Sequence, residues 1–144
     1  THNGVFITRH GFFTTVFLST EGVVMKMRSH KDLDVWKRSM NLATGVYELT
    51  RTWPSNEQYG ITSQVRRAAV SVPSNIAEGA ARSSAKDFSR FIDIAQGSLA
   101  EVETQLELAG RIGIIDGDSG LENEIISVRR MLGGLKKSLL RVPS

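Results

Sequence analysis

Apolar residues recur at three- and four-residue steps along most of the chain after residue 30, which is the spacing that one face of an α-helix requires. The pattern is clearest from Thr62 to Gly79, where small residues flank the apolar ones and would let neighbouring helices approach closely. The apolar positions here are Ile61, Val65, Ala68, Val72 and Ile76. We predict a helix in this segment, which Gly79 ends in a left-handed cap.

Three further helices are predicted by the same spacing, one before this segment and two after it. The first runs from about Asp32 to Thr52. The third follows a cap at Ser83 or Ser84 and carries an apolar seam from Phe88 to Ala109, and the fourth follows a cap at Asp118 or Ser119 and carries one from Leu121 to Leu139. Four amphipathic helices joined by short loops indicate an all-α fold, an antiparallel up-down-up-down four-helix bundle that occupies residues 25–144.

The first predicted helix carries two apolar stripes instead of one. One stripe comprises Leu33, Trp36, Met40, Ala43 and Tyr47, and the other comprises Val35, Leu42, Val46 and Leu49. A helix that packs on a single neighbour does not need so wide an apolar face. This helix therefore either lies deep in the bundle or also contacts another subunit. The candidate residues for such an oligomer interface are Trp36, Val35, Leu42 and Val46.

Residues 1–24 differ from the rest of the chain, because they are rich in β-branched and aromatic residues and are punctuated by glycines. This composition predicts an extended or hairpin-like N-terminal extension. The extension is either a leader, tag or translated upstream sequence, with Met25 or Met27 as a plausible translation start, or an arm that docks on the bundle or on a neighbouring subunit. Polar residues interrupt its apolar stretch, and it lacks the features of a signal peptide, so no membrane partner is expected.

The chain offers little of the chemistry that catalysis or metal binding requires. It has no cysteine, which excludes disulfides and zinc–cysteine sites and fits a cytoplasmic protein. The histidines His2, His10 and His30 all precede the first helix, and the sequence has neither a Glu-x-x-His pair nor a phosphate-binding loop. We therefore predict a non-enzymatic protein with no catalytic residue, no metal and no cofactor.

Charge is distributed unevenly over the predicted third and fourth helices. Residues 91–124 contain eight acidic residues and one basic residue, whereas residues 125–144 contain five basic residues and no acidic one. Antiparallel packing would gather the acids at one end of the bundle and the bases at the other. This basic pole would comprise Lys26, Arg28, Lys31, Lys37, Arg38, Arg82, Lys86, Arg90, Lys136, Lys137 and Arg141.

The basic pole has two interpretations, a solvated surface and a surface that binds phosphates. Bases near the end of a helix suit its dipole, but Arg82, Lys86 and Arg90 stand at the start of one, where the dipole disfavours cations. Their spacing of four residues places them on one helix face, as a salt-dependent contact with nucleic acid would require. The candidate nucleic-acid-binding residues are Arg82, Lys86, Arg90, Lys136, Lys137, Arg66 and Arg67. Arg66 and Arg67 are equally plausible as ion-pair partners between helices or subunits.

Three segments of the chain together resemble a known family. They are DLDVWKRSMNL (residues 32–42), YGITSQVRRAAVSVPSNIAEGAAR (residues 59–82) and FSRFIDIAQGSLAEVETQLELA (residues 88–109). They resemble the four-helix-bundle proteins encoded in 23S rRNA intervening sequences, which are often labelled ribosomal proteins. The resemblance spans nearly all of residues 25–140 and implies a cytosolic bacterial four-helix bundle, whereas residues 1–24 match no pattern of the family.

The same segments are similar to the accessory proteins of diversity-generating retroelements. Those proteins form five-membered rings and bind a reverse transcriptase and nucleic acid, so the similarity implies a homopentamer. We therefore expect a homo-oligomeric bundle that binds RNA or DNA through its basic pole. The alternative is a protein–protein scaffold whose acidic and basic surfaces mediate assembly or recruit a partner enzyme.

Overall fold

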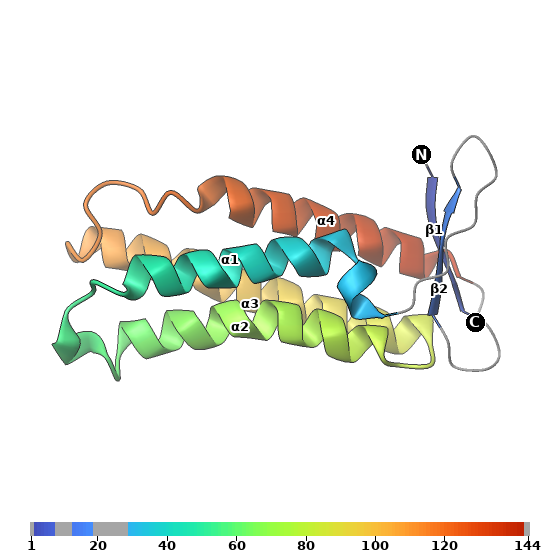
Figure 1. Ribbon diagram of the computed structural model, residues 1–144, viewed down its shortest axis with the longest axis horizontal. Helices are drawn as coiled ribbons and strands as arrows, with labels where there is room; N and C mark the ends of the chain where they lie inside the picture. The colour runs from blue at the N-terminus through green and yellow to red at the C-terminus, as the bar shows by residue number, and fades with distance from the viewer. Residues whose placement is uncertain (1, 8–12, 19–28, 143–144) are drawn as a thin grey trace.

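The computed structural model describes residues 2–7, 13–18 and 29–142, and within them four long helices run antiparallel as a bundle (Figure 1). The helices are α1 (Asp34–Thr50), α2 (Ile61–Ala80), α3 (Ala85–Arg111) and α4 (Glu122–Leu140). Short 3-10 helices, η1 (His30–Asp32) and η2 (Ser55–Glu57), precede α1 and α2. The predicted all-α, up-down-up-down bundle is thus confirmed, and each helix lies within a few residues of its expected bounds.

The N-terminal extension forms a two-stranded antiparallel hairpin of β1 (His2–Ile7) and β2 (Phe13–Leu18). His2 pairs with Leu18 and Ile7 pairs with Phe13. The hairpin lies at the end of the bundle where α4 finishes, and β1 contacts α4 (Figure 1). The predicted hairpin is therefore present, whereas Lys26 and Arg28 of the expected basic pole lie outside the described residues.

Large apolar side chains from all four helices fill the space between them. Fully buried examples are Leu42 from α1, Ile76 from α2, Phe88 from α3 and Leu132 from α4. Among the described elements, α2 and α3 make the most extensive contact. A polar link crosses this contact, because the hydroxyl groups of Ser71 and Ser98 lie 2.8 Å apart.

The two apolar stripes of α1 face in different directions. Val35, Leu42 and Val46 are buried in the core of their own bundle and offer no surface to a second subunit, which corrects their assignment to an oligomer interface. In the other stripe, Leu33 and Ala43 are buried as well, whereas Met40 and Tyr47 are 40% and 46% exposed. Both stripes have helical spacing, so only the rotation of α1 against its neighbours determines which one is buried.

Gly79 does not cap α2, contrary to expectation. It lies inside the helix, which continues to Ala80 and ends at Ala81 in a right-handed conformation. Among the described residues, only Gly113, Gly117 and Gly120 have positive φ. A methyl group on Gly79 would lie 2.8 Å from atoms of both Phe88 and Phe91 of α3. The glycine therefore serves the close approach of two helices instead of a turn.

Candidate nucleic-acid interface

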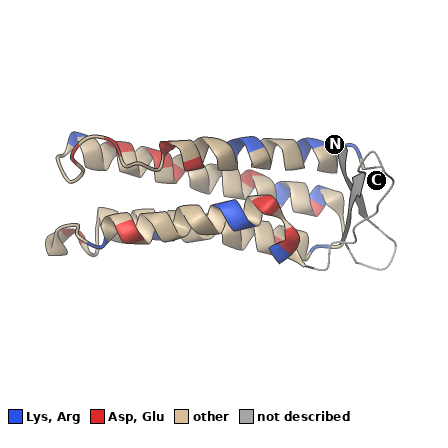
Figure 2. Cartoon of the chain, turned by 45° about the horizontal axis from the view of Figure 1, so that its top comes forward, with Lys and Arg blue, Asp and Glu red and all other residues tan. Residues whose placement is uncertain are grey.

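A short turn, residues 81–84, joins α2 to α3 at the end of the bundle where α4 finishes, and Lys and Arg positions lie near this end (Figure 2). The hydroxyl group of Ser84 accepts a hydrogen bond of 3.1 Å from the backbone N–H of Asp87 and so caps α3. Arg82 in the turn and Lys86 and Arg90 on α3 are all exposed. We call these three residues the basic triad.

Both arginines of the basic triad lie over the same aromatic ring. The guanidinium carbon of Arg82 is 4.7 Å from the centroid of Phe91, and that of Arg90 is 5.4 Å from it. Phe91 is only 8% exposed, and its Cβ is one of the atoms that approach Gly79. The α2–α3 contact thus fixes the ring, and the ring attracts both guanidinium groups.

No ion pair to a carboxylate involves the basic triad within the described part of the chain. Cations on the neighbouring surfaces differ in this respect. Lys136 of α4 forms an ion pair with Asp93 of α3, and Arg129 of α4 forms one with Glu103. Lys137, the other predicted residue of α4, is exposed. The predicted residues of α3 and α4 therefore lie at the same end of the bundle, and Lys136 is paired with a carboxylate.

Arg66 and Arg67 do not belong to this surface. They precede Arg82 by 16 and 15 residues along α2, so about 22 Å of helix separates Arg67 from the turn. Arg66 donates a hydrogen bond of 2.8 Å from its Nε to the Thr50 hydroxyl group, and its guanidinium carbon lies 4.7 Å from the centroid of Tyr47. It thus links α2 to α1, through a hydroxyl group and a ring instead of the ion pair considered above. Arg67 is exposed.

The opposite end of the bundle carries acidic residues where α3 ends and α4 begins (Figure 2). Glu122 opens α4 and accepts hydrogen bonds of 3.0 Å and 2.8 Å from the backbone N–H and the hydroxyl group of Ser119. Its own backbone N–H and these Ser119 donors hold the pKa of the Glu122 carboxyl below its usual range. The charge separation expected from the sequence is present, and a phosphate would meet repulsion at this end.

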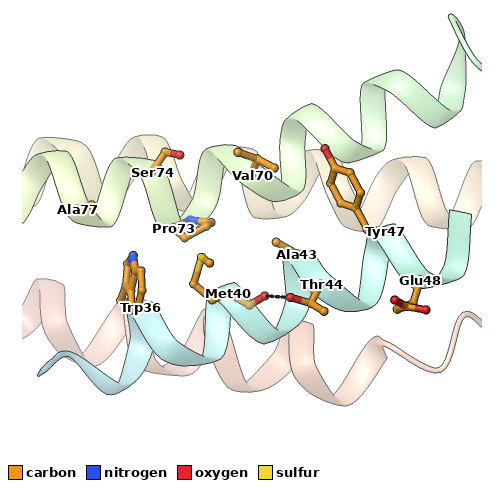
Figure 3. A pocket seen from close by; sticks show the side chains of 10 residues that line it. All are labelled: Trp36, Met40, Ala43, Thr44, Tyr47, Glu48, Val70, Pro73, Ser74 and Ala77. Atoms are coloured by element: carbon orange, nitrogen blue, oxygen red, sulfur yellow. Dashed lines mark hydrogen bonds between the residues drawn. The ribbon is translucent and has the colours of Figure 1, made fainter. Parts of the chain in front are cut away.

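A groove between α1 and α2 is the feature that the sequence interpretation did not identify. Its volume is about 440 Å³, and Figure 3 shows the side chains that line it. They are Trp36, Met40, Ala43, Thr44, Tyr47 and Glu48 from α1, and Val70, Pro73, Ser74 and Ala77 from α2. Most of the α1 members belong to the stripe of Trp36, so the groove accounts for the surplus apolar surface of that helix. The rings of His30 and Trp36 form a T-shaped pair at one end of the groove, with 5.1 Å between the ring centroids.

The described residues contain no group of three His, Asp or Glu side chains that could hold a metal ion. In the same part of the chain, no helix combines the length and the apolar character that a bilayer span requires. The candidate site is therefore the basic triad together with its neighbours on α4, and its chemistry is that of exposed cations.

The fold and this surface define a class of protein, a small antiparallel four-helix bundle with one basic end. The model of the family described as 23S rRNA-intervening sequence protein matches residues 31–134, more than two thirds of the chain. The chain belongs to this family, which confirms the resemblance seen in its three sequence segments.

Among solved structures, the chain is similar to a protein with unknown function from the S23 ribosomal protein family of Bacteroides thetaiotaomicron VPI-5482. The two chains are 25% identical over 74% of this chain and 94% of the other, with a TM-score of 0.49. No curated protein matches the chain.

Proposed function

We propose that the protein is a non-enzymatic, homo-oligomeric bundle that binds RNA or DNA through its basic triad. The supporting observation is that Arg82, Lys86 and Arg90 are exposed and have no carboxylate partner within the described residues. Like charges one turn apart destabilise a helix, and cations near its N-terminus oppose its dipole. Phosphate groups would neutralise the charges and relieve both costs. A bacterial cytoplasm, where nucleic acid is accessible, fits a chain without cysteine.

The proposed binding surface extends from the basic triad to Lys137 of α4, with Lys136 at its margin. Lys136 reaches Asp93, which follows Arg90 by three residues and therefore lies on the same face of α3. The surface is confined to one end of the bundle, and Arg66 and Arg67 take no part in it. Such a surface would bind phosphates electrostatically, with little sequence preference.

Fluorescence anisotropy with a labelled RNA hairpin and a labelled DNA duplex, across a salt series, tests this proposal. The variant R82Q/K86Q/R90Q should bind more weakly. Its plot of the logarithm of the binding constant against the logarithm of the salt concentration should be less steep, by about 0.9 for each phosphate that the protein no longer neutralises. The matched control is R51Q/R67Q/R111Q, which removes the same formal charge near the acidic end. An equal loss of affinity in the control, or no binding by the natural chain at low salt, would contradict the proposal.

Self-association through the α1–α2 groove is the second part of the proposal, with a homopentamer as the expected state. Its support is the exposure of Met40, Tyr47 and Val70, which are 40%, 46% and 42% exposed around the groove. A second copy of the chain would bury them and gain hydrophobic free energy. Trp36 is the one predicted interface residue that lines the groove, at its His30 end.

Multi-angle light scattering of M40E/V70E, beside I94E/I126E as control, tests the groove. Each pair replaces two similarly exposed apolar residues, on α1 and α2 in the first case and on α3 and α4 in the second. We expect the groove variant to become monomeric and the control to remain assembled. A monomeric natural chain at micromolar concentration would contradict the oligomer. An assembled chain that binds no nucleic acid would instead support the alternative function, a protein–protein scaffold.

A further inference from the structure

The arginines of the basic triad are held in place without the use of their hydrogen-bond donors. A guanidinium over an aromatic ring is attracted by the negative face of the ring, and this attraction consumes none of its five N–H groups. Neither the guanidinium group of Arg82 nor that of Arg90 donates a hydrogen bond to another group in the part of the chain that the structure describes. Two positioned guanidinium groups with free donors therefore face solvent.

The ring that positions them is unavailable to a ligand. Phe91 is 8% exposed, packs where α2 approaches α3 and has both guanidinium groups over it. A nucleic acid base thus finds no free aromatic face at this site, although proteins that bind single strands rely on such faces. Phosphate oxygens suit the site better, because a guanidinium binds them through two parallel N–H groups.

We propose that Arg82, Phe91 and Arg90 form a preformed clamp for backbone phosphates of a double-stranded nucleic acid. Each guanidinium binds one phosphate group through paired N–H donors, and Lys86 adds charge between them. The clamp reads the backbone of an RNA or DNA duplex and not its bases. This inference rests on the proposed function and specifies which part of the nucleic acid is bound and in which form.

The variant R82K/R90K tests the clamp, because it retains both charges and removes the paired donors of each guanidinium. We expect its affinity for a labelled duplex of 20 base pairs to fall about tenfold, with little change in the salt slope. The matched control R129K/R130K makes the same exchange on α4, away from Phe91, and should leave the affinity unchanged. RNA duplex, DNA duplex and a single strand of the same length are compared in parallel.

Affinity of R82K/R90K within twofold of the natural chain would overturn the clamp and leave the proposed function intact, because charge alone would then suffice. Tighter binding of the single strand than of both duplexes would also overturn it. If the natural chain binds none of the three probes, the proposed function fails as well. The additional variant F91L removes the ring and keeps an apolar side chain, and it should lower duplex affinity. Because F91L changes a buried residue and R82K/R90K changes only exposed ones, a loss of affinity in both variants is not explained by a loss of stability.

Discussion

The cations at the start of α3 and those along α4 occupy neighbouring surfaces but have different partners. Arg129 and Lys136 of α4 meet the carboxylates of Glu103 and Asp93, whereas Arg82 and Arg90 meet the ring of Phe91. A carboxylate neutralises a cation, but an aromatic ring holds it in place and leaves its charge and donors available. The number of bases on a surface is therefore a poorer guide to a phosphate site than the nature of their partners.

A substitution at Gly79 can disturb the contact of the two arginines with Phe91 while both arginines stay unchanged. In G79A the new methyl group would lie 2.8 Å from Phe91 Cβ and Phe88 Cδ1, so α2 and α3 must move apart. We expect a loss of about 1–3 kcal/mol in the free energy of unfolding and weaker duplex binding as Phe91 shifts. Urea unfolding and anisotropy measure the two effects.

The control for this change is G97A, on α3. No heavy atom within 4 Å would meet its methyl group, and alanine favours helix over glycine. We expect this variant to gain about 0.5–1 kcal/mol of stability. If G79A were as stable as G97A, the tight α2–α3 contact would not be what fixes the ring.

Arg66 and Arg67 extend the comparison to adjacent arginines with different partners. Arg66 combines a ring contact with a hydrogen bond to the buried Thr50, and Arg67 is exposed. R66A should therefore lower the free energy of unfolding by about 1–2 kcal/mol, while R67A should stay within about 0.5 kcal/mol. Neither change should alter duplex affinity by more than twofold. Equal stability of the two variants by urea unfolding would show that the Arg66 contacts contribute little.

On the carboxylate side of the comparison, a paired cation can be released. D93N removes the carboxylate that pairs with Lys136. The control E101Q removes one negative charge from the same helix, at a carboxylate that belongs to none of the ion pairs described above. D93N should raise duplex affinity about two- to threefold relative to E101Q, because Lys136 then becomes available to phosphate. Stability should change by less than about 1 kcal/mol in both, since exposed ion pairs contribute little. Equal affinities would mean that the ion pair does not compete with the ligand.

The smallest effect concerns the acidic end, where Glu122 has a lowered pKa. A carboxyl whose pKa is lower in the folded state stabilises the fold above its unfolded pKa, and this contribution is lost as pH falls through the folded value. E122Q should thus be slightly less stable than the natural chain at pH 7, by less than about 1 kcal/mol, and equally stable in strong acid. Thermal unfolding across pH measures this convergence. A constant difference at every pH would rule out the carboxylate as its source.

Helical periodicity was sufficient to predict the bundle, because four amphipathic segments with short loops have few other ways to bury their apolar faces. It did not predict which stripe of α1 is buried. Two stripes of α1 satisfy the helical spacing, the one with Val35, Leu42 and Val46 and the one with Trp36. Only the packing of α1 against α2 and α4 distinguishes them. Gly79 was misassigned for a related reason, since glycine permits both a turn and a close helix contact.

The basic triad was predictable from its spacing and its position at the start of a helix, but its partners were not. Arg82 lies in the turn between α2 and α3, and Phe91 lies on α3, so their contact depends on the geometry of that turn. The pairing of Lys136 with Asp93 likewise depends on the register between α3 and α4. Arg66 and Arg67 lie away from the basic triad because of the topology: the start and end of a 20-residue helix are at opposite ends of the bundle.

The short turn between α2 and α3 also bears on the order in which the chain acquires its structure. Only residues 81–84 separate the two helices that share the most extensive contact, so little entropy is lost in bringing them together. Such local contacts favour early formation in helical proteins. We expect V72A in this contact to slow refolding more than V128A in α4, as a chevron analysis would show. The basic triad and Phe91 would then be in place while α4 is still unfolded, so that a chain emerging from the ribosome would carry the proposed clamp before the bundle is complete.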